Sequence, residues 1–215
     1  KIGSSQRLSR EDAMKPWINR GVIDLLVGFE NQDLFPFSLF LYQQGIEKLA
    51  KAYLIGSLSF QFEQLDSQSA TWRIDEIGRN YGHKLSDLLG VISMILGELR
   101  THHTTIEFLE AASEEGRYPS LIGKKRSMFE KQSAMDSHVK GGWEKIAPII
   151  SIILNGIERD FGINVLKRDE PVYCIKPERW DKFLDYLELP NPRKAQIARN
   201  KVKISQIIKE PTRSL

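Results

Sequence analysis

Hydrophobic residues recur at spacings of three and four along almost every long segment of the chain, whereas alternation with period two is rare. This spacing is typical of amphipathic helices, because positions three and four apart share one helical face. It predicts a first helix that begins at the capping pair Ser9 and Asp12 and ends near Glu30. A second helix, capped by Asp33, is expected to run to about Ser59.

The middle of the chain predicts a third long helix between two irregular segments. Residues 63–81 are polar and favour a loop with a short helix around Trp72–Arg79. The third long helix is expected from about Lys84 to Ala112, where leucines and isoleucines keep the helical spacing. Glycine and proline residues between positions 116 and 123 then interrupt the pattern.

The last helix of the body is expected between about Met135 and Phe161. Pro148 should kink or restart it, and Gly162 is a plausible stop. Four long helices with short or moderate connections predict an all-α fold over residues 1–162, an antiparallel up-and-down bundle of four or five helices.

Residues 163–215 predict a linker, a short amphipathic helix and a basic extension. The short helix should span Pro177–Leu189, and a final basic helix is expected over Arg193–Lys209. Seven Lys or Arg residues and one Glu follow position 190, whereas the whole chain carries a net charge of +3. The preceding 190 residues are therefore mildly acidic, and the tail could face a polyanion or an acidic surface of the body.

Composition narrows the class of protein. A chain of 215 residues with 41% hydrophobic and 27% charged residues is typical of a globular protein and excludes a disordered or collagen-like chain. The single Cys174 cannot close a disulfide within the chain, which favours a reducing, cytoplasmic environment. No apolar run approaches the roughly 20 residues that span a bilayer, so we expect no membrane partner.

A polar stripe lies on the expected second helix. Gln44, Glu47, Lys48 and Lys51 fall at i, i+3, i+4 and i+7 and share one face. An amide, a carboxylate and two ammonium groups could contact a phosphate or a base. The alternative is a solvated face whose Glu47–Lys51 pair contributes about 0.3–0.5 kcal/mol.

Three segments in order resemble a known family. QQGIEKLAKAYLI, GHKLSDLL and EGRYPS are similar to the helix signature, the His-x-Leu-x-x-Leu helix entry and the Arg-Tyr-Pro turn of HEPN domains (higher eukaryotes and prokaryotes nucleotide-binding). The resemblance covers about residues 35–161. It implies a helical bundle, commonly homodimeric, that binds nucleotides or nucleic acid. Some members accompany a nucleotidyltransferase, and others are metal-independent ribonucleases, including toxins and phage-defence proteins.

The ribonuclease members carry an Arg followed, after four to six residues, by a His. Metal-free RNA cleavage needs a group that handles the 2′-OH proton and a cation that stabilises the phosphate. Arg79 and His83 are the candidate catalytic pair, but only three residues separate them. An atypical pair, a site composed across a dimer and a helix-start role for His83 all stay open.

A basic and aromatic cluster is the second candidate binding site. Its residues can pair with phosphates while the tyrosine ring stacks on a base: they are Arg117, Tyr118, Lys124, Lys125 and Arg126. The alternative is that Arg117 and Tyr118 hold the loop against the bundle. His103 and Glu107 lie one turn apart, but no third ligand has matching spacing, so we expect neither a metal nor a cofactor.

Three functions remain open at this point. The first is a HEPN-like nucleotide or nucleic-acid binding protein that is non-catalytic alone and acts with a nucleotidyltransferase or in a toxin or defence system. The second is a metal-independent ribonuclease. The third is a bundle that docks another protein through residues 177–189 and the basic tail.

Overall fold

The computed structural model describes residues 8–31, 37–62, 65, 67–81, 84–117, 142–163, 165 and 177–187. Their regular elements are all helical and include no strand, which confirms the all-α fold. The elements are α1 (Arg10–Glu30), α2 (Phe37–Phe62), α3 (Ser67–Asn80), α4 (Leu85–Ile92), the 3-10 helix η1 (Gly97–His102), α5 (His103–Arg117), α7 (Gly142–Phe161) and α8 (Pro177–Tyr186). None of the described helices is both long and apolar enough to cross a membrane.

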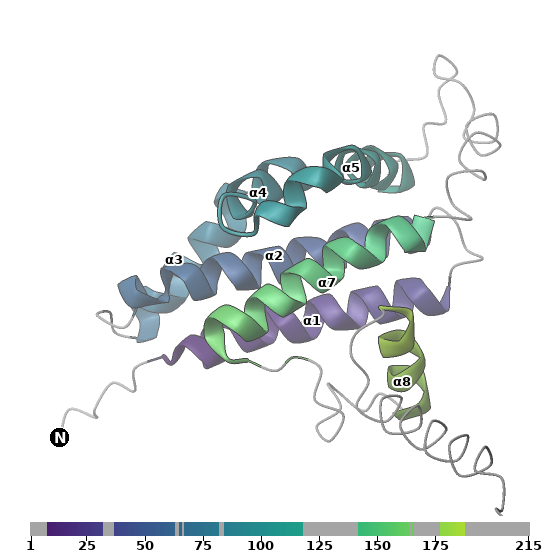
Figure 1. Ribbon diagram of the computed structural model, residues 1–215. Helices are drawn as coiled ribbons and strands as arrows, with labels where there is room; N and C mark the ends of the chain where they lie inside the picture. The colour runs from purple at the N-terminus through teal and green to yellow at the C-terminus, as the bar shows by residue number, and fades with distance from the viewer. Residues whose placement is uncertain are drawn as a thin grey trace, which may run out of the picture.

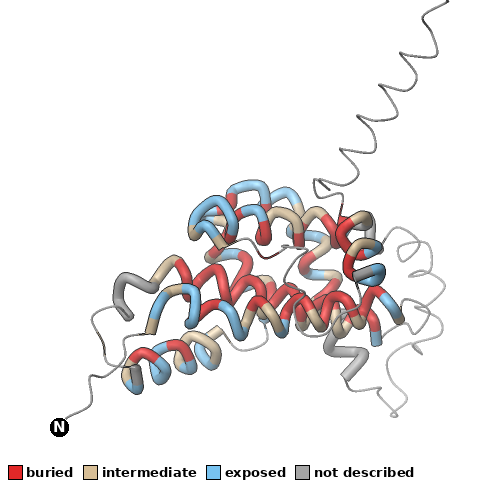
Figure 2. Tube along the Cα trace, turned by 90° about the horizontal axis from the view of Figure 1, so that it is seen from below, coloured by how far each residue is buried: buried red, intermediate tan, exposed pale blue. Residues whose placement is uncertain are grey.

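Helix α2 is the centre of the bundle and contacts α1, α3, α4, α5 and α7. Helices α1, α2 and α7 lie along one another, and the segment from α4 to α5 lies on the side of α2 and α7 that is away from α1 (Figure 1). α1 and α2 are antiparallel, because Gly21 meets Gly45 while Gly28 meets Tyr42. α7 runs in the same direction as α2, since Gly156 meets Tyr53 while Phe161 meets Gly56. Buried residues follow the faces that the helices turn toward one another (Figure 2).

The start of α1 and the end of α7 agree with the sequence. The Asp12 amide donates to the Ser9 hydroxyl oxygen over 3.1 Å, so Ser9 is the expected N-cap. Gly162 has a positive φ of 68° directly after α7, as a helix stop requires. Pro148 lies inside the continuous α7 and does not restart it. The cap at Asp33 and the segment 118–141, which includes the expected start at Met135, lie outside the described residues.

Two expectations for the middle of the chain are wrong. α3 spans fourteen residues rather than a short piece of a loop. The expected helix Lys84–Ala112 is divided, because α4 ends at Ile92 and a turn leads into η1 and α5. Leu96 in this turn has non-helical dihedral angles (φ −95°, ψ 75°) and is buried against α7, where Gly156 leaves room for it. A straight helix would forgo this packing, so burial of Leu96 explains the break.

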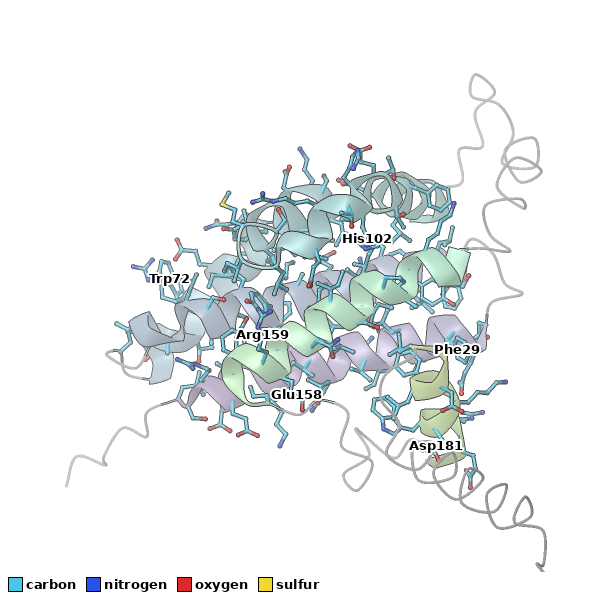
Figure 3. The ribbon with its side chains drawn as sticks, in the orientation of Figure 1. Phe29, Trp72, His102, Glu158, Arg159 and Asp181 are labelled. Carbon is cyan, nitrogen blue, oxygen red and sulfur yellow. The ribbon has the colours of Figure 1, made fainter. Side chains whose placement is uncertain are left out.

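Helix α8 packs onto the C-terminal end of α1 (Figure 3). Its four expected apolar residues are all buried: Trp180, Phe183, Leu184 and Leu187. The rings of Phe29 and Phe183 meet edge to face at 6.1 Å, and Arg179 pairs with Glu30 at 3.1 Å. The apolar face of α8 is therefore occupied by the body of the same chain. The basic segment Arg193–Lys209 lies outside the described residues.

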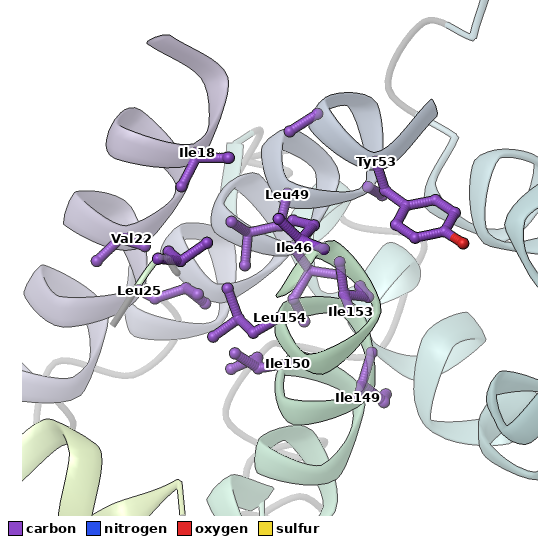
Figure 4. Close-up of a cluster of buried hydrophobic side chains, with 14 of the residues drawn as sticks. Ile18, Val22, Leu25, Ile46, Leu49, Tyr53, Ile149, Ile150, Ile153 and Leu154 are labelled. Carbon is purple, nitrogen blue, oxygen red and sulfur yellow. The ribbon is translucent and has the colours of Figure 1, made fainter. Parts of the chain in front are cut away.

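The core is one cluster of side chains from α1, α2 and α7, extended by α4, α5 and α8. Ile18, Val22 and Leu25 of α1 interleave with isoleucines and leucines of α2 and α7 (Figure 4). Glycines bring the first two backbones together: a Cβ on Gly45 would lie 2.8 Å from the Gly21 carbonyl oxygen and 2.5 Å from Leu25 Cγ. The tight α1–α2 pair holds the polar residues described next.

Candidate functional site: a polar cluster between three helices

The polar stripe of α2 faces the interior of the bundle. Glu47 and Lys51 are only 4% and 3% exposed, and the neighbouring Gln43 is fully buried. Gln44 and Lys48 are partly buried. The interpretation as a solvated face is therefore wrong for Glu47 and Lys51, although the expected pair between them is present.

The Glu47 carboxylate is fully supplied with donors inside α2. Lys51 Nζ lies 2.7 Å from Oε1, while the side-chain amides of Gln43 and Gln44 donate to Oε2 at 3.2 and 3.4 Å. Gln44 also donates to Gln43 Oε1 at 2.7 Å. A buried charge is tolerated only when it is paired and hydrogen-bonded, and this carboxylate satisfies both conditions.

Lys51 connects α2 to the C-terminal turn of α3. Its Nζ donates to the Gly78 carbonyl oxygen over 3.1 Å and lies 5.7 Å from the centre of the Trp17 ring on α1. Carbonyls in the last turn of a helix lack intrahelical partners and carry partial negative charge, so an ammonium group stabilises them. Gly78 permits the approach, because a Cβ there would come within 3.2 Å of the Trp17 ring.

Lys48 makes the corresponding contact to α1. Its Nζ lies 2.7 Å from Asp24 Oδ2, and Arg20 Nε lies 3.3 Å from Asp24 Oδ1. Asp24 is buried, the Lys48 side chain is 20% exposed and the Arg20 side chain is 66% exposed. The polar cluster, defined as Asp24, Gln43, Gln44, Glu47, Lys48 and Lys51, therefore reaches solvent on the side of Arg20.

Arg79 belongs to the same neighbourhood. It directly follows Gly78 in the last turn of α3 and is exposed. The fold thus brings the stripe of α2 together with the candidate arginine, which lies 28 positions beyond Lys51 in the sequence. His83 lies outside the described residues, so the Arg79–His83 geometry stays a prediction. So do the roles of Tyr118, Lys124, Lys125 and Arg126 and of the Arg117 side chain, all outside the described part of the chain.

Three cations pair with two carboxylates at this place, and the excess positive charge suits an anion. The cations are Arg20, Lys48 and Lys51, and the carboxylates are Asp24 and Glu47. Arg20 is the exposed member, and the exposed Arg79 follows Gly78 in the neighbouring turn of α3. Among the described residues no group of three or more His, Cys, Asp or Glu could hold a metal ion. The chemistry available here is binding of an anion by ammonium and guanidinium groups.

A second polar group, on the opposite face of α2, has a structural role. The Tyr53 hydroxyl donates to Asp160 Oδ2 over 2.5 Å, and Arg159 places two nitrogens on the same carboxylate at 2.6 and 2.8 Å. Burial and the Asp160 carboxylate raise the pKa of Tyr53, while Arg159 holds the pKa of Asp160 below its usual value. The tyrosine stays protonated and ties α7 to α2.

Sequence reasoning missed Asp24, Gln43 and Gly78 as contributors to this site. Asp24 interrupts an apolar run of α1 and lies seven residues after Trp17, a signal that both share one face. Gln43 lies four residues before Glu47 and eight before Lys51, a spacing that also places it on their face. Gly78 acts through its backbone carbonyl, which no side-chain pattern reveals.

Comparisons with known proteins do not assign the chain to a family. No family model matches the chain, and neither a curated protein nor a solved structure matches it significantly.

Proposed function

We propose that this chain is a HEPN-like module that binds a phosphate group of a nucleotide or nucleic acid at the polar cluster and is non-catalytic alone. The observation that carries the proposal is the hydrogen bond from Lys51 to the Gly78 carbonyl, because it joins the α2 stripe to the turn that bears Arg79. The exposed Arg20 on α1 shares Asp24 with the partly buried Lys48, and the exposed Arg79 lies in the α3 turn that Lys51 contacts.

The energetics of the cluster support a role beyond folding. Burying a salt bridge removes two charges from water, and well-packed apolar residues in its place are often as stable. A core that keeps two carboxylates and two lysines departs from the apolar pattern of its surroundings, and such departures are expected at functional sites. The fixed network holds Lys48 and the α3 turn in place, so a ligand would meet a preorganised surface.

The resemblance in QQGIEKLAKAYLI supports the same location, because this signature supplies Gln44, Glu47, Lys48 and Lys51. A homodimer, a nucleotidyltransferase partner and a toxin or phage-defence role belong to the proposal only through that resemblance. Docking of another protein through α8 is less favoured, since the apolar face of α8 is buried within the chain.

Direct binding tests the proposal. Fluorescence anisotropy with labelled ATP and with single-stranded RNA of about 12 nucleotides should show binding that weakens as salt rises from about 50 to 200 mM. The double variant Arg20→Gln/Arg79→Gln should weaken binding about tenfold and reduce the salt slope by about 1 for each phosphate that it no longer neutralises. Arg100→Gln, an exposed arginine of η1, is the matched control. If wild-type protein binds neither probe, the proposal fails.

The ribonuclease alternative is tested with the same RNA in EDTA. Cleavage that His83→Ala abolishes would replace the non-catalytic proposal by the metal-independent ribonuclease. An intact RNA band in the presence of bound protein supports binding without catalysis.

A further inference from the structure

The outer face of α3 carries an exposed tryptophan. Trp72 is 56% exposed, whereas Trp17 is partly buried beside Lys51 and Trp180 of α8 is buried. Trp72 lies on the side of α3 that faces away from α1 and α7 (Figure 3). Such exposure of a large aromatic side chain needs an explanation, because burying the ring in the core would stabilise the fold.

Polar groups surround this ring in a regular pattern. Gln68 precedes Trp72 by four residues and Asp75 follows it by three, so both share its helical face, and both are exposed. Arg79 follows by seven residues on the same face. The Arg73 guanidinium lies 5.5 Å from the Trp72 ring centre and is held by Glu76 at 2.9 Å.

We propose that Trp72 is a stacking platform for an unpaired base of single-stranded nucleic acid, with Gln68 and Asp75 facing the edge of that base. The proposal rests on the proposed function, because Arg79 and the polar cluster supply the phosphate contacts. Bases stack on tryptophan irrespective of sequence, and the neighbouring planar guanidinium adds a second flat surface.

The number of contacts favours a strand over a free nucleotide. Seven residues of α helix rise about 10 Å, so Trp72 and Arg79 are about 10 Å apart along the axis. Both have long side chains, so one nucleotide or two neighbouring nucleotides can reach from the ring to the guanidinium. A strand places further bases and phosphates over the same surface, so each added nucleotide can add a contact.

The charge of the platform favours a base rather than the backbone. Asp75 lies between Trp72 and Arg79 on this face, and its carboxylate repels phosphates. A carboxylate accepts hydrogen bonds but donates none, so it can pair with the exocyclic amino groups of adenine and cytosine and with the N3–H of uracil. Asp75 therefore suits the edge of a base better than a phosphate, without selecting one base.

The experiment measures oligonucleotide binding by the full chain. Trp72→Ala should weaken binding of labelled oligo(A) of about 12 nucleotides at least fivefold, because the stacked base loses its ring. Trp72→Phe keeps a ring and should retain most of the affinity. Trp72 is exposed, and unchanged thermal melting confirms an intact fold.

The outcomes separate the two proposals. If Trp72→Ala binds oligo(A) like wild type while the Arg20/Arg79 double variant is weakened, the stacking platform is wrong and the proposed function stands. The same holds if Trp72→Phe weakens binding of oligo(A) as much as Trp72→Ala does. If wild type binds neither ATP nor any oligonucleotide, both proposals fall.

Discussion

Lys51 on α2 donates a hydrogen bond to the main-chain carbonyl of Gly78 on α3, over 3.1 Å, while its charge is balanced by Glu47 one turn away. One side chain thus closes the last turn of α3 and neutralises a buried carboxylate. Without Lys51, the buried Glu47 carboxylate would lose its counter-charge and the Gly78 carbonyl would lose this hydrogen-bond donor.

Lys51→Met should lower the free energy of unfolding by about 3–5 kcal/mol, because it leaves Glu47 buried without a counter-charge. Urea denaturation measures the decrease. Glu47→Gln combined with Lys51→Met should recover much of it, since the pair is replaced by groups without charge. Lys182→Met, an exposed lysine of α8, is the control. Equal effects of Lys51→Met and Lys182→Met would contradict the buried pair.

Gly45→Ala should destabilise the protein by about 1–3 kcal/mol. The added methyl group would meet Leu25 Cγ at 2.5 Å and the Gly21 carbonyl at 2.8 Å, and the close backbones of α1 and α2 cannot yield without separating. Gly90→Ala is the matched control, because nothing lies within 4 Å of its Cβ. That change lies in helix α4 and should stabilise by about 0.4–1 kcal/mol. Thermal melting should show a lower melting temperature for Gly45→Ala and a higher one for Gly90→Ala.

The contact between Tyr53 and Asp160 predicts a dependence of stability on acid. Arg159 and the Tyr53 hydroxyl hold the pKa of Asp160 lower in the folded state than in the unfolded state. The stabilisation is therefore present above the unfolded value of about 4 and is lost as pH falls through the folded pKa. Wild type should exceed Asp160→Asn in stability at pH 7, and the difference should shrink below about pH 4. A constant difference from pH 7 to pH 2 would contradict this.

Phe183→Ala should release α8 from the body. Phe183 is fully buried and meets Phe29 edge to face, so its truncation should cost about 3–5 kcal/mol of local or global stability. Hydrogen exchange of the α8 amides measures the local part. Lys182→Ala, the exposed neighbour, should leave exchange unchanged. Protection of α8 that survives Phe183→Ala would show that other contacts hold the helix.

The fold was largely predictable, because α1, α2, α7 and α8 carry clear apolar stripes and recognisable end signals such as Ser9 and Gly162. The break before η1 was not, since Leu85–Leu99 keeps helical spacing and only packing of Leu96 against Gly156 favours the turn. The polar cluster was half predictable. Spacing placed Gln44, Glu47, Lys48 and Lys51 on one face, but whether that face meets water or other helices depends on contacts with Asp24 and Gly78, far away in sequence.

The close packing of α1 and α2 also bears on the order in which the helices assemble during folding. Gly21 and Gly45 lie 24 positions apart in the chain, whereas Leu96 and Gly156 lie 60 apart and Tyr53 and Asp160 lie 107 apart. Contacts near in sequence cost less loop-closure entropy, so the hairpin of α1 and α2 should form early and provide the template on which α7 docks. In stopped-flow refolding, Gly45→Ala should then slow folding, while Gly156→Ala should mainly speed unfolding.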